Sequence, residues 1–93
     1  MSLQVQWTSQ FKKDYKLASK RGRNMDALDD TIRMLANETP LPRNYCDHAL
    51  SGSFKGFREC HVEPDWLLIY AVENSVLTLT LARTGTHSDL FNR

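Results

Sequence analysis

Residues 57–82 read FRECHVEPDWLLIYAVENSVLTLTLA, and this stretch decides the fold. Apolar, β-branched and aromatic residues fill three segments of it, residues 57–62, 66–72 and 76–82, which predicts three strands. Turn-forming residues separate them, Glu63-Pro64-Asp65 at the first junction and Glu73-Asn74-Ser75 at the second. Because connections this short join neighbouring antiparallel strands, the stretch predicts an antiparallel sheet.

Upstream of this sheet, the sequence predicts a short strand and two helices. The apolar residues at positions 3, 5 and 7 alternate with glutamines, as on a strand with one buried face. Phe11, Tyr15 and Ala18 then recur at helical spacing, and a second helical stripe begins at Met25. We therefore expect an α+β domain ordered β-α-α-β-β-β, in which a helix hairpin packs on a small, mainly antiparallel sheet.

Length and composition bound the class of protein. A chain of 93 residues suffices for one core, so residues 1–93 are expected to form a single domain. Hydrophobic residues make up 41% and charged residues 25%, as in ordinary globular proteins. The sequence has no apolar run near the roughly 20 residues that span a bilayer, and its first residues lack a signal-peptide pattern. We expect a cytoplasmic protein without a membrane contact, with Cys46 and Cys60 as free thiols.

The three histidines lie in the second half of the chain, among acidic, arginine and aromatic residues. His48 falls in a long connection without periodicity, His61 near the end of a predicted strand, and His87 after the last one. Together with Asp65 and Arg83, they would supply a proton donor, a proton acceptor and an anion clamp. The set predicts acid–base chemistry on a phosphate or similar anion; the alternative is ordinary surface or hydrogen-bonded histidines.

A zinc site is a competing interpretation of the same region. Cys46, His48, Cys60 and His61 offer four candidate ligands, but their spacing is not that of a zinc finger. Side chains also alternate along a strand, so Cys60 and His61 are expected to point to opposite faces. We expect no metal and no other cofactor, and a metal-binding module stays as an alternative.

Four segments of the chain resemble the YafQ toxins, a branch of the RelE/ParE superfamily. They are residues 47–52 (DHALSG), 56–58 (GFR), 61–70 (HVEPDWLLIY) and 83–91 (RTGTHSDLF). The combination of His-x-x-Pro-Asp-Trp with Arg-Thr-Gly-x-His carries the resemblance, which extends from Phe11 to Phe91. It implies a microbial ribonuclease-like fold and an endoribonuclease that cleaves mRNA in the ribosomal A site. It also implies neutralisation by a small antitoxin, in a complex that binds operator DNA.

The resemblance also implies which residues form the site. Its catalytic positions are His48, His61, Asp65, Arg83 and His87, with Phe91 contacting the substrate. Cleaving RNA without a metal needs a base for the 2′-hydroxyl, an acid for the departing 5′-oxygen and a cation near the phosphate. We expect His87 to be the acid and Arg83 the clamp. The other two histidines and Asp65 provide the base and its orienting partners, and they stay undistinguished because such groups titrate together.

Other basic and aromatic residues are expected to contact RNA. Phe91 would stack on a base, or alternatively pin the C-terminal tail to the core. The further expected substrate contacts are Arg58, Lys12, Lys13, Lys16 and Lys20. Since the net charge is only +1, binding to free RNA should be weak, and the lysines would meet rRNA phosphates on the ribosome.

Two further expectations concern other proteins. An antitoxin is expected to lay an acidic segment near the histidines or over the basic helix face. The rival function within the same fold is that of a ParE-like toxin, which acts on DNA gyrase by binding and would not need three clustered histidines.

Overall fold

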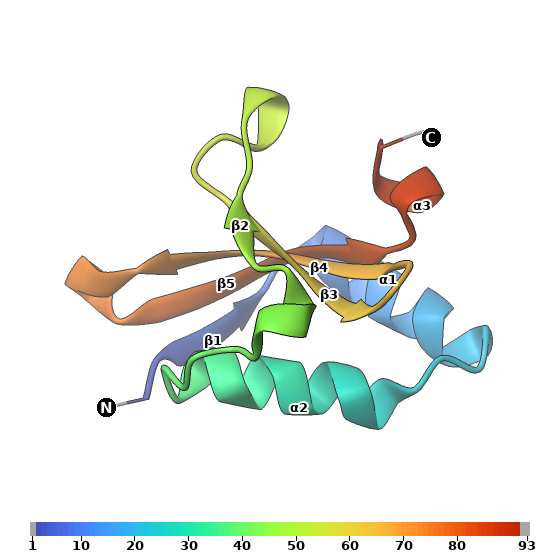
Figure 1. The fold of residues 1–93 in the computed structure, drawn as a ribbon, viewed down its shortest axis with the longest axis horizontal. Coiled ribbons are helices and arrows are strands. Elements are labelled where there is room, and N and C mark those ends of the chain that lie inside the picture. Colours follow the sequence, from blue (N-terminus) through green and yellow to red (C-terminus); the bar gives the residue numbers. More distant parts are fainter. Residues whose placement is uncertain (1, 92–93) are drawn as a thin grey trace.

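The computed structural model describes residues 2–91 and confirms the α+β class. Figure 1 shows β1 (Gln4–Trp7), α1 (Ser9–Lys20), α2 (Met25–Ala36), β2 (His48–Ala49), β3 (Arg58–Glu63), β4 (Trp66–Glu73), β5 (Thr78–Gly85) and α3 (His87–Phe91). Single 3-10 turns lie at Arg43–Tyr45, Gly52–Phe54 and Asn74–Val76. The predicted order β-α-α-β-β-β is present, and the sequence analysis missed the short elements β2 and α3.

The strands form one mixed sheet in the order β1-β5-β4-β3-β2. β1 runs parallel to β5, and the other neighbours are antiparallel. The last strand was predicted at 76–82 but begins two residues later and ends three residues later. It starts late because residues 74–76 form a 3-10 turn and Leu77 has a φ of 47°. It ends late because Gly85 still pairs with Leu67, whose carbonyl accepts a 2.7 Å bond from the Thr84 hydroxyl.

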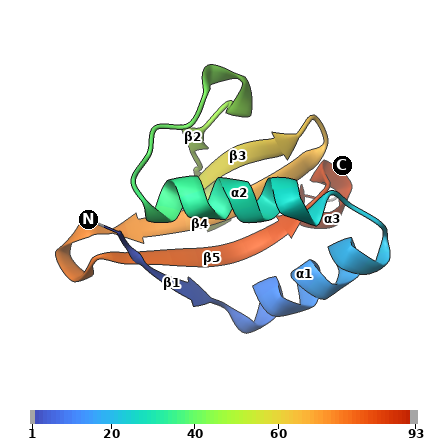
Figure 2. The same cartoon turned by 90° about the horizontal axis from the view of Figure 1, so that it is seen from below.

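Both helices cover the same face of the sheet, as the two ribbon views show (Figures 1 and 2). Thr8 caps α1 by accepting a 3.0 Å bond from the Phe11 amide. Core side chains on the helices and the facing side of the strands include Phe11, Ala18, Leu28, Leu35, Cys60, Trp66, Leu68, Tyr70, Leu79 and Leu81. The other face carries the polar side chains of Glu59 and His61 beside the buried Leu67 and Ile69.

Two details of the helix side differ from the expectation. Trp7 lies on the edge strand β1 and is 39% exposed rather than buried, although its ring contacts Phe11 and Tyr15. Asp14 is buried in the stripe of α1, although it is charged. Among the described residues, no helix is long and apolar enough to cross a membrane.

The two cysteines are free thiols in contrasting environments. Cys60 is fully buried, and burial raises the pKa of its thiol to about 12, whereas Cys46 is exposed. Because the thiolate is the form that reacts, iodoacetamide at pH 8 should label Cys46 alone in the native protein and both cysteines in urea. Mass spectrometry of the labelled peptides checks this. Equal labelling of both cysteines in the native protein would contradict the packing of β3.

Candidate active site

The histidines gather on the face of the sheet that the helices leave open. On β3, Glu59 and His61 alternate with Cys60, which belongs to the core. β2 places His48 opposite Glu59. A Glu59 carboxylate oxygen lies 3.7 Å from Nε2 of His48 and 3.6 Å from Nε2 of His61. The rings of His61 and His87 are 5.7 Å apart between centroids. The structure thus brings the three predicted histidines together around one buried carboxylate.

Hydrogen bonds orient two of these rings. Nδ1 of His48 lies 2.8 Å from the Cys46 carbonyl oxygen, and Nδ1 of His87 lies 2.6 Å from Oδ1 of Asp65. A carbonyl or carboxylate oxygen accepts only, so both Nδ1 atoms are assigned as donors and each Nε2 is left to exchange protons. Asp65 also accepts the His87 backbone N–H at 3.0 Å. The bonds from the His87 backbone and ring lower the pKa of Asp65, which keeps it an ionised orienting group.

A cavity of about 340 Å³ opens beside the cluster. His48, Glu59, His87 and Phe91 line it together with residues of the 50–54 loop. The Phe91 ring meets Phe54 edge to face, with centroids 5.8 Å apart. Phe91 thus stands at the wall of the cavity, in contact with this loop, where it can receive a stacked base.

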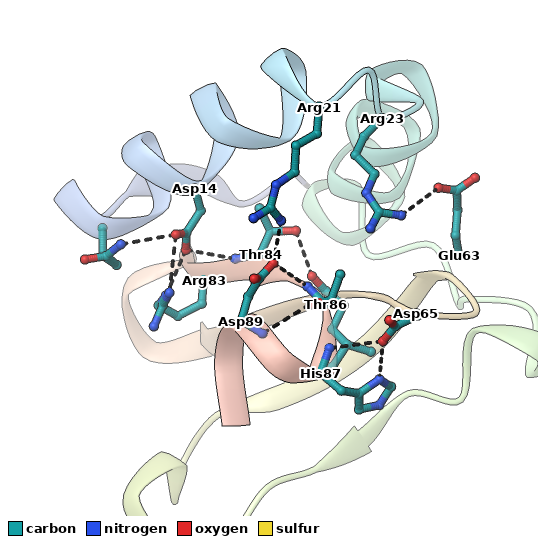
Figure 3. A network of polar contacts seen from close by, with 12 residues as sticks. Asp14, Arg21, Arg23, Glu63, Asp65, Arg83, Thr84, Thr86, His87 and Asp89 are labelled. Atoms are coloured by element: carbon teal, nitrogen blue, oxygen red, sulfur yellow. Dashed lines mark hydrogen bonds and ion pairs between the residues drawn. The ribbon is translucent and has the colours of Figure 1, made fainter. Parts of the chain in front are cut away.

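The guanidinium of Arg83 is paired with Asp14 of α1 and not with a histidine of the cluster. It forms a side-on pair with Asp14, with Nε 2.8 Å from Oδ2 and Nη2 3.3 Å from Oδ1. Glu59 on β3 and Arg83 on β5 both pair with Ile69 of β4, so the three residues lie side by side across the sheet. Figure 3 nevertheless shows Arg83 and His87 on opposite sides of the first turn of α3. Arg83 therefore flanks the site.

The other predicted RNA contacts lie outside the cluster. Arg58 alternates with Glu59 on β3, and its Nε binds Oδ1 of Asp47 at 2.9 Å. Asp47 also accepts from the Tyr70 hydroxyl, whose pKa is raised first by burial and then by this bond. Arg58 therefore anchors the residue before His48 rather than entering the site. The four lysines are exposed on α1, on the helix side of the sheet: Lys12, Lys13, Lys16 and Lys20.

The structure does not assemble the zinc set considered from the sequence. Cys60 is buried on the helix side, as the alternation predicted, while His61 lies on the other face. A different trio comes together: the ligand atoms of Glu59, His61 and His87 lie within 4.8 Å of one another. Carboxylate and imidazole ligands suit several divalent metals. Glu59 is the site residue that the sequence analysis missed, and its signal was its position two residues before His61 on the same strand face.

A helix pair on one face of a small sheet and a histidine cluster on the other agree with the class of toxin that the sequence resembles. Residues 3–92 match the family model described as bacterial toxin of type II toxin-antitoxin system, YafQ. The chain belongs to the YafQ toxin family.

Relatives of known name and structure agree with this assignment. The chain is 48% identical to the mRNA interferase toxin YafQ of Escherichia coli K12 over 94% of each chain. Its fold superposes with a TM-score of 0.89 on a chain of the E. coli DinJ-YafQ toxin-antitoxin complex, at 46% identity, covering 98% and 99% of the two chains. A metal-bound toxin from Helicobacter pylori gives a TM-score of 0.89 at 43% identity, covering 96% and 99%. The predicted family and fold are confirmed.

Proposed function

We propose that this protein is an endoribonuclease of the mRNA interferase type. The observation that carries the proposal is the cluster of His48, His61 and His87 around Glu59, beside an open cavity. Two of the rings have Nδ1 fixed and Nε2 available, which is what proton transfer requires. The 48% identical relative from E. coli is named an mRNA interferase, which supports the same activity here.

The chemistry follows from these groups without a metal. A base removes the proton of a 2′-hydroxyl, the freed oxygen attacks the adjacent phosphorus, and the bond to the 5′-oxygen breaks. Nε2 of His87 gives its proton to that departing oxygen, so the products are a 2′,3′-cyclic phosphate and a 5′-hydroxyl. Asp65 is engaged with His87, which leaves His48 or His61, in contact with Glu59, to act as the base.

Arg83 supplies positive charge from the flank of the site. Asp14 occupies its Nε and Nη2, so Nη1 keeps its donors for a phosphate oxygen. Charge stabilisation at a phosphorane is among the largest contributions that a fixed donor can make. Phe91 would hold the neighbouring base at the cavity wall.

The substrate is proposed to be message in the A site of a translating ribosome. A net charge of +1 holds free RNA weakly, whereas the lysines of α1 can meet rRNA phosphates. Purified protein should cleave message at least about tenfold faster in ribosomal complexes than naked, because the ribosome positions the substrate. Mapping of new 5′ ends on both substrates measures this. Equal rates would exclude dependence on the ribosome, and no cleavage of either would exclude the nuclease.

The proposed regulation is neutralisation by a cognate antitoxin in the cytoplasm. The E. coli relative was solved in a toxin–antitoxin complex, and the shared fold supports a similar partner here. We propose that such a complex binds operator DNA. A ParE-like action on gyrase is disfavoured, because binding alone would not require three histidines arranged around a carboxylate.

A metal-binding role is the second candidate, because Glu59, His61 and His87 could hold an ion. If the reaction is metal-independent, cleavage of message on ribosomes should continue unchanged after the toxin is dialysed against EDTA. Ribosomes need Mg²⁺, so the chelator is removed before mixing. Loss of cleavage that returns with one equivalent of a divalent metal would replace the proton-transfer mechanism by a metal-assisted one.

A further inference from the structure

Asp14 is a buried carboxylate that the proposed chemistry leaves unexplained. It is 8% exposed and lies on the core side of α1 with Phe11 and Ala18. A carboxylate in such a place is unfavourable unless hydrogen bonds replace its water. Asp14 accepts from Nε2 of Gln10 at 3.1 Å and from the backbone N–H of Thr84 at 3.2 Å, besides two nitrogens of Arg83.

The donors to Asp14 come mainly from the end of β5. β1 pairs with β5 only as far as Leu81, and the Thr8 hydroxyl that follows β1 donates to the Ala82 carbonyl, so β1 and its end give no partner to the backbone beyond Ala82. Asp14 takes that place: it accepts the Thr84 N–H and fixes the preceding side chain, Arg83, in a two-point fork. Three residues after Thr84, α3 begins at His87 (Figure 3).

Stability alone does not require the ion pair between Asp14 and Arg83. Apolar residues of similar size often replace a buried ion pair without loss of stability. The fork does provide orientation, because it fixes the plane of the guanidinium and leaves Nη1 unused by Asp14. A nearby pair, Arg21 with Asp89 at 2.8 Å, also links α1 to the start of α3 but does not touch Arg83.

We propose that Asp14 is a positioning residue that holds Arg83 for contact with an RNA phosphate. The inference rests on the proposed function and adds a residue to its machinery. Asp14 itself does not touch the substrate. It acts through Arg83, so its removal should matter only while Arg83 is present.

The test is a double-mutant cycle on cleavage of ribosome-bound message. Arg83→Ala should lower kcat by about 10²–10³-fold, the typical effect of losing a charge-stabilising donor. Asp14→Asn keeps an oxygen for the Thr84 N–H but removes the charge and the fork, and should lower kcat about tenfold or more with a smaller change in KM. The double variant should be no slower than Arg83→Ala alone. Asp30→Asn, in an exposed pair with Arg33 on α2, is the matched control and should keep wild-type kinetics.

A measurement without substrate complements the cycle. The Nε–H resonance of Arg83 in an NMR spectrum of the free protein should exchange slowly with water in the wild type and rapidly in Asp14→Asn. Either of two results would overturn the positioning role alone. One is a double variant whose loss of kcat is the product of the losses in the two single variants. The other is wild-type kcat in Asp14→Asn while Arg83→Ala is slow. Wild-type kcat in Arg83→Ala would overturn both this role and the proposed clamp. Absence of cleavage by the wild type would refute the proposed function. In that case the NMR measurement still tests the fork, because an Arg83 Nε–H exchange rate that is the same in Asp14→Asn as in the wild type would contradict it.

Discussion

The His87→Ala variant is expected to cleave ribosome-bound message about 10²–10⁴-fold more slowly than the wild type, the usual effect of removing a general acid. The side chain of His87 is 38% exposed and its ring bond is to an exposed Asp65, so little packing is lost. The free energy of unfolding should change by no more than about 0.5 kcal/mol, as for surface substitutions. Single-turnover cleavage and urea unfolding measure the two effects on the same preparation.

Two companion variants separate chemistry from folding. Arg33→Ala removes an exposed side chain of α2 and should keep full activity. Asp65→Asn retains an oxygen for the His87 N–H but loses the charge beside the ring, so an intermediate rate is expected. Full cleavage by a folded His87→Ala protein would remove His87 from the reaction and transfer the acid role to another group of the cluster.

The fold was predictable because its long elements have clear periodicity. Alternation along β3 put Cys60 and His61 on opposite faces, and the structure confirms it. β2 has only two residues and α3 only five, which is too short for a pattern to appear in the sequence. These two elements carry His48 and His87, so the least predictable parts of the fold hold two of the site residues.

The site was predictable in its residue types but not in its connections. The alternation that separates Cys60 from His61 also puts Glu59 on the face of His61, yet nothing local shows that two more histidines approach it. The Asp14–Arg83 pair joins residues 69 positions apart, and Asp14 lies in a run of charged residues that resembles a solvated surface. Contacts of this kind depend on how α1 crosses the edge of β5, which single-sequence patterns do not contain.

The carboxylate of Glu59 shows a mismatch between stability and function. It is only 5% exposed, yet its histidine neighbours lie at 3.6 and 3.7 Å, longer than a hydrogen bond. Such a group is unfavourable for folding and suited to receive a further partner, such as a substrate hydroxyl. Sites of this kind are typical of enzymes that give up stability for activity.

Glu59→Gln is therefore expected to lower cleavage by about 10²-fold or more, while leaving the free energy of unfolding equal to that of the wild type or about 1 kcal/mol higher. The amide keeps the shape of the side chain but cannot support a positive charge on His48 or His61 during proton transfer. Cleavage on ribosomes and urea unfolding give the two quantities. Glu73→Gln, at the exposed end of β4, is the matched control and should change neither. If Glu59→Gln unfolds more easily and still cleaves at the wild-type rate, Glu59 is a structural residue and the histidines act without it.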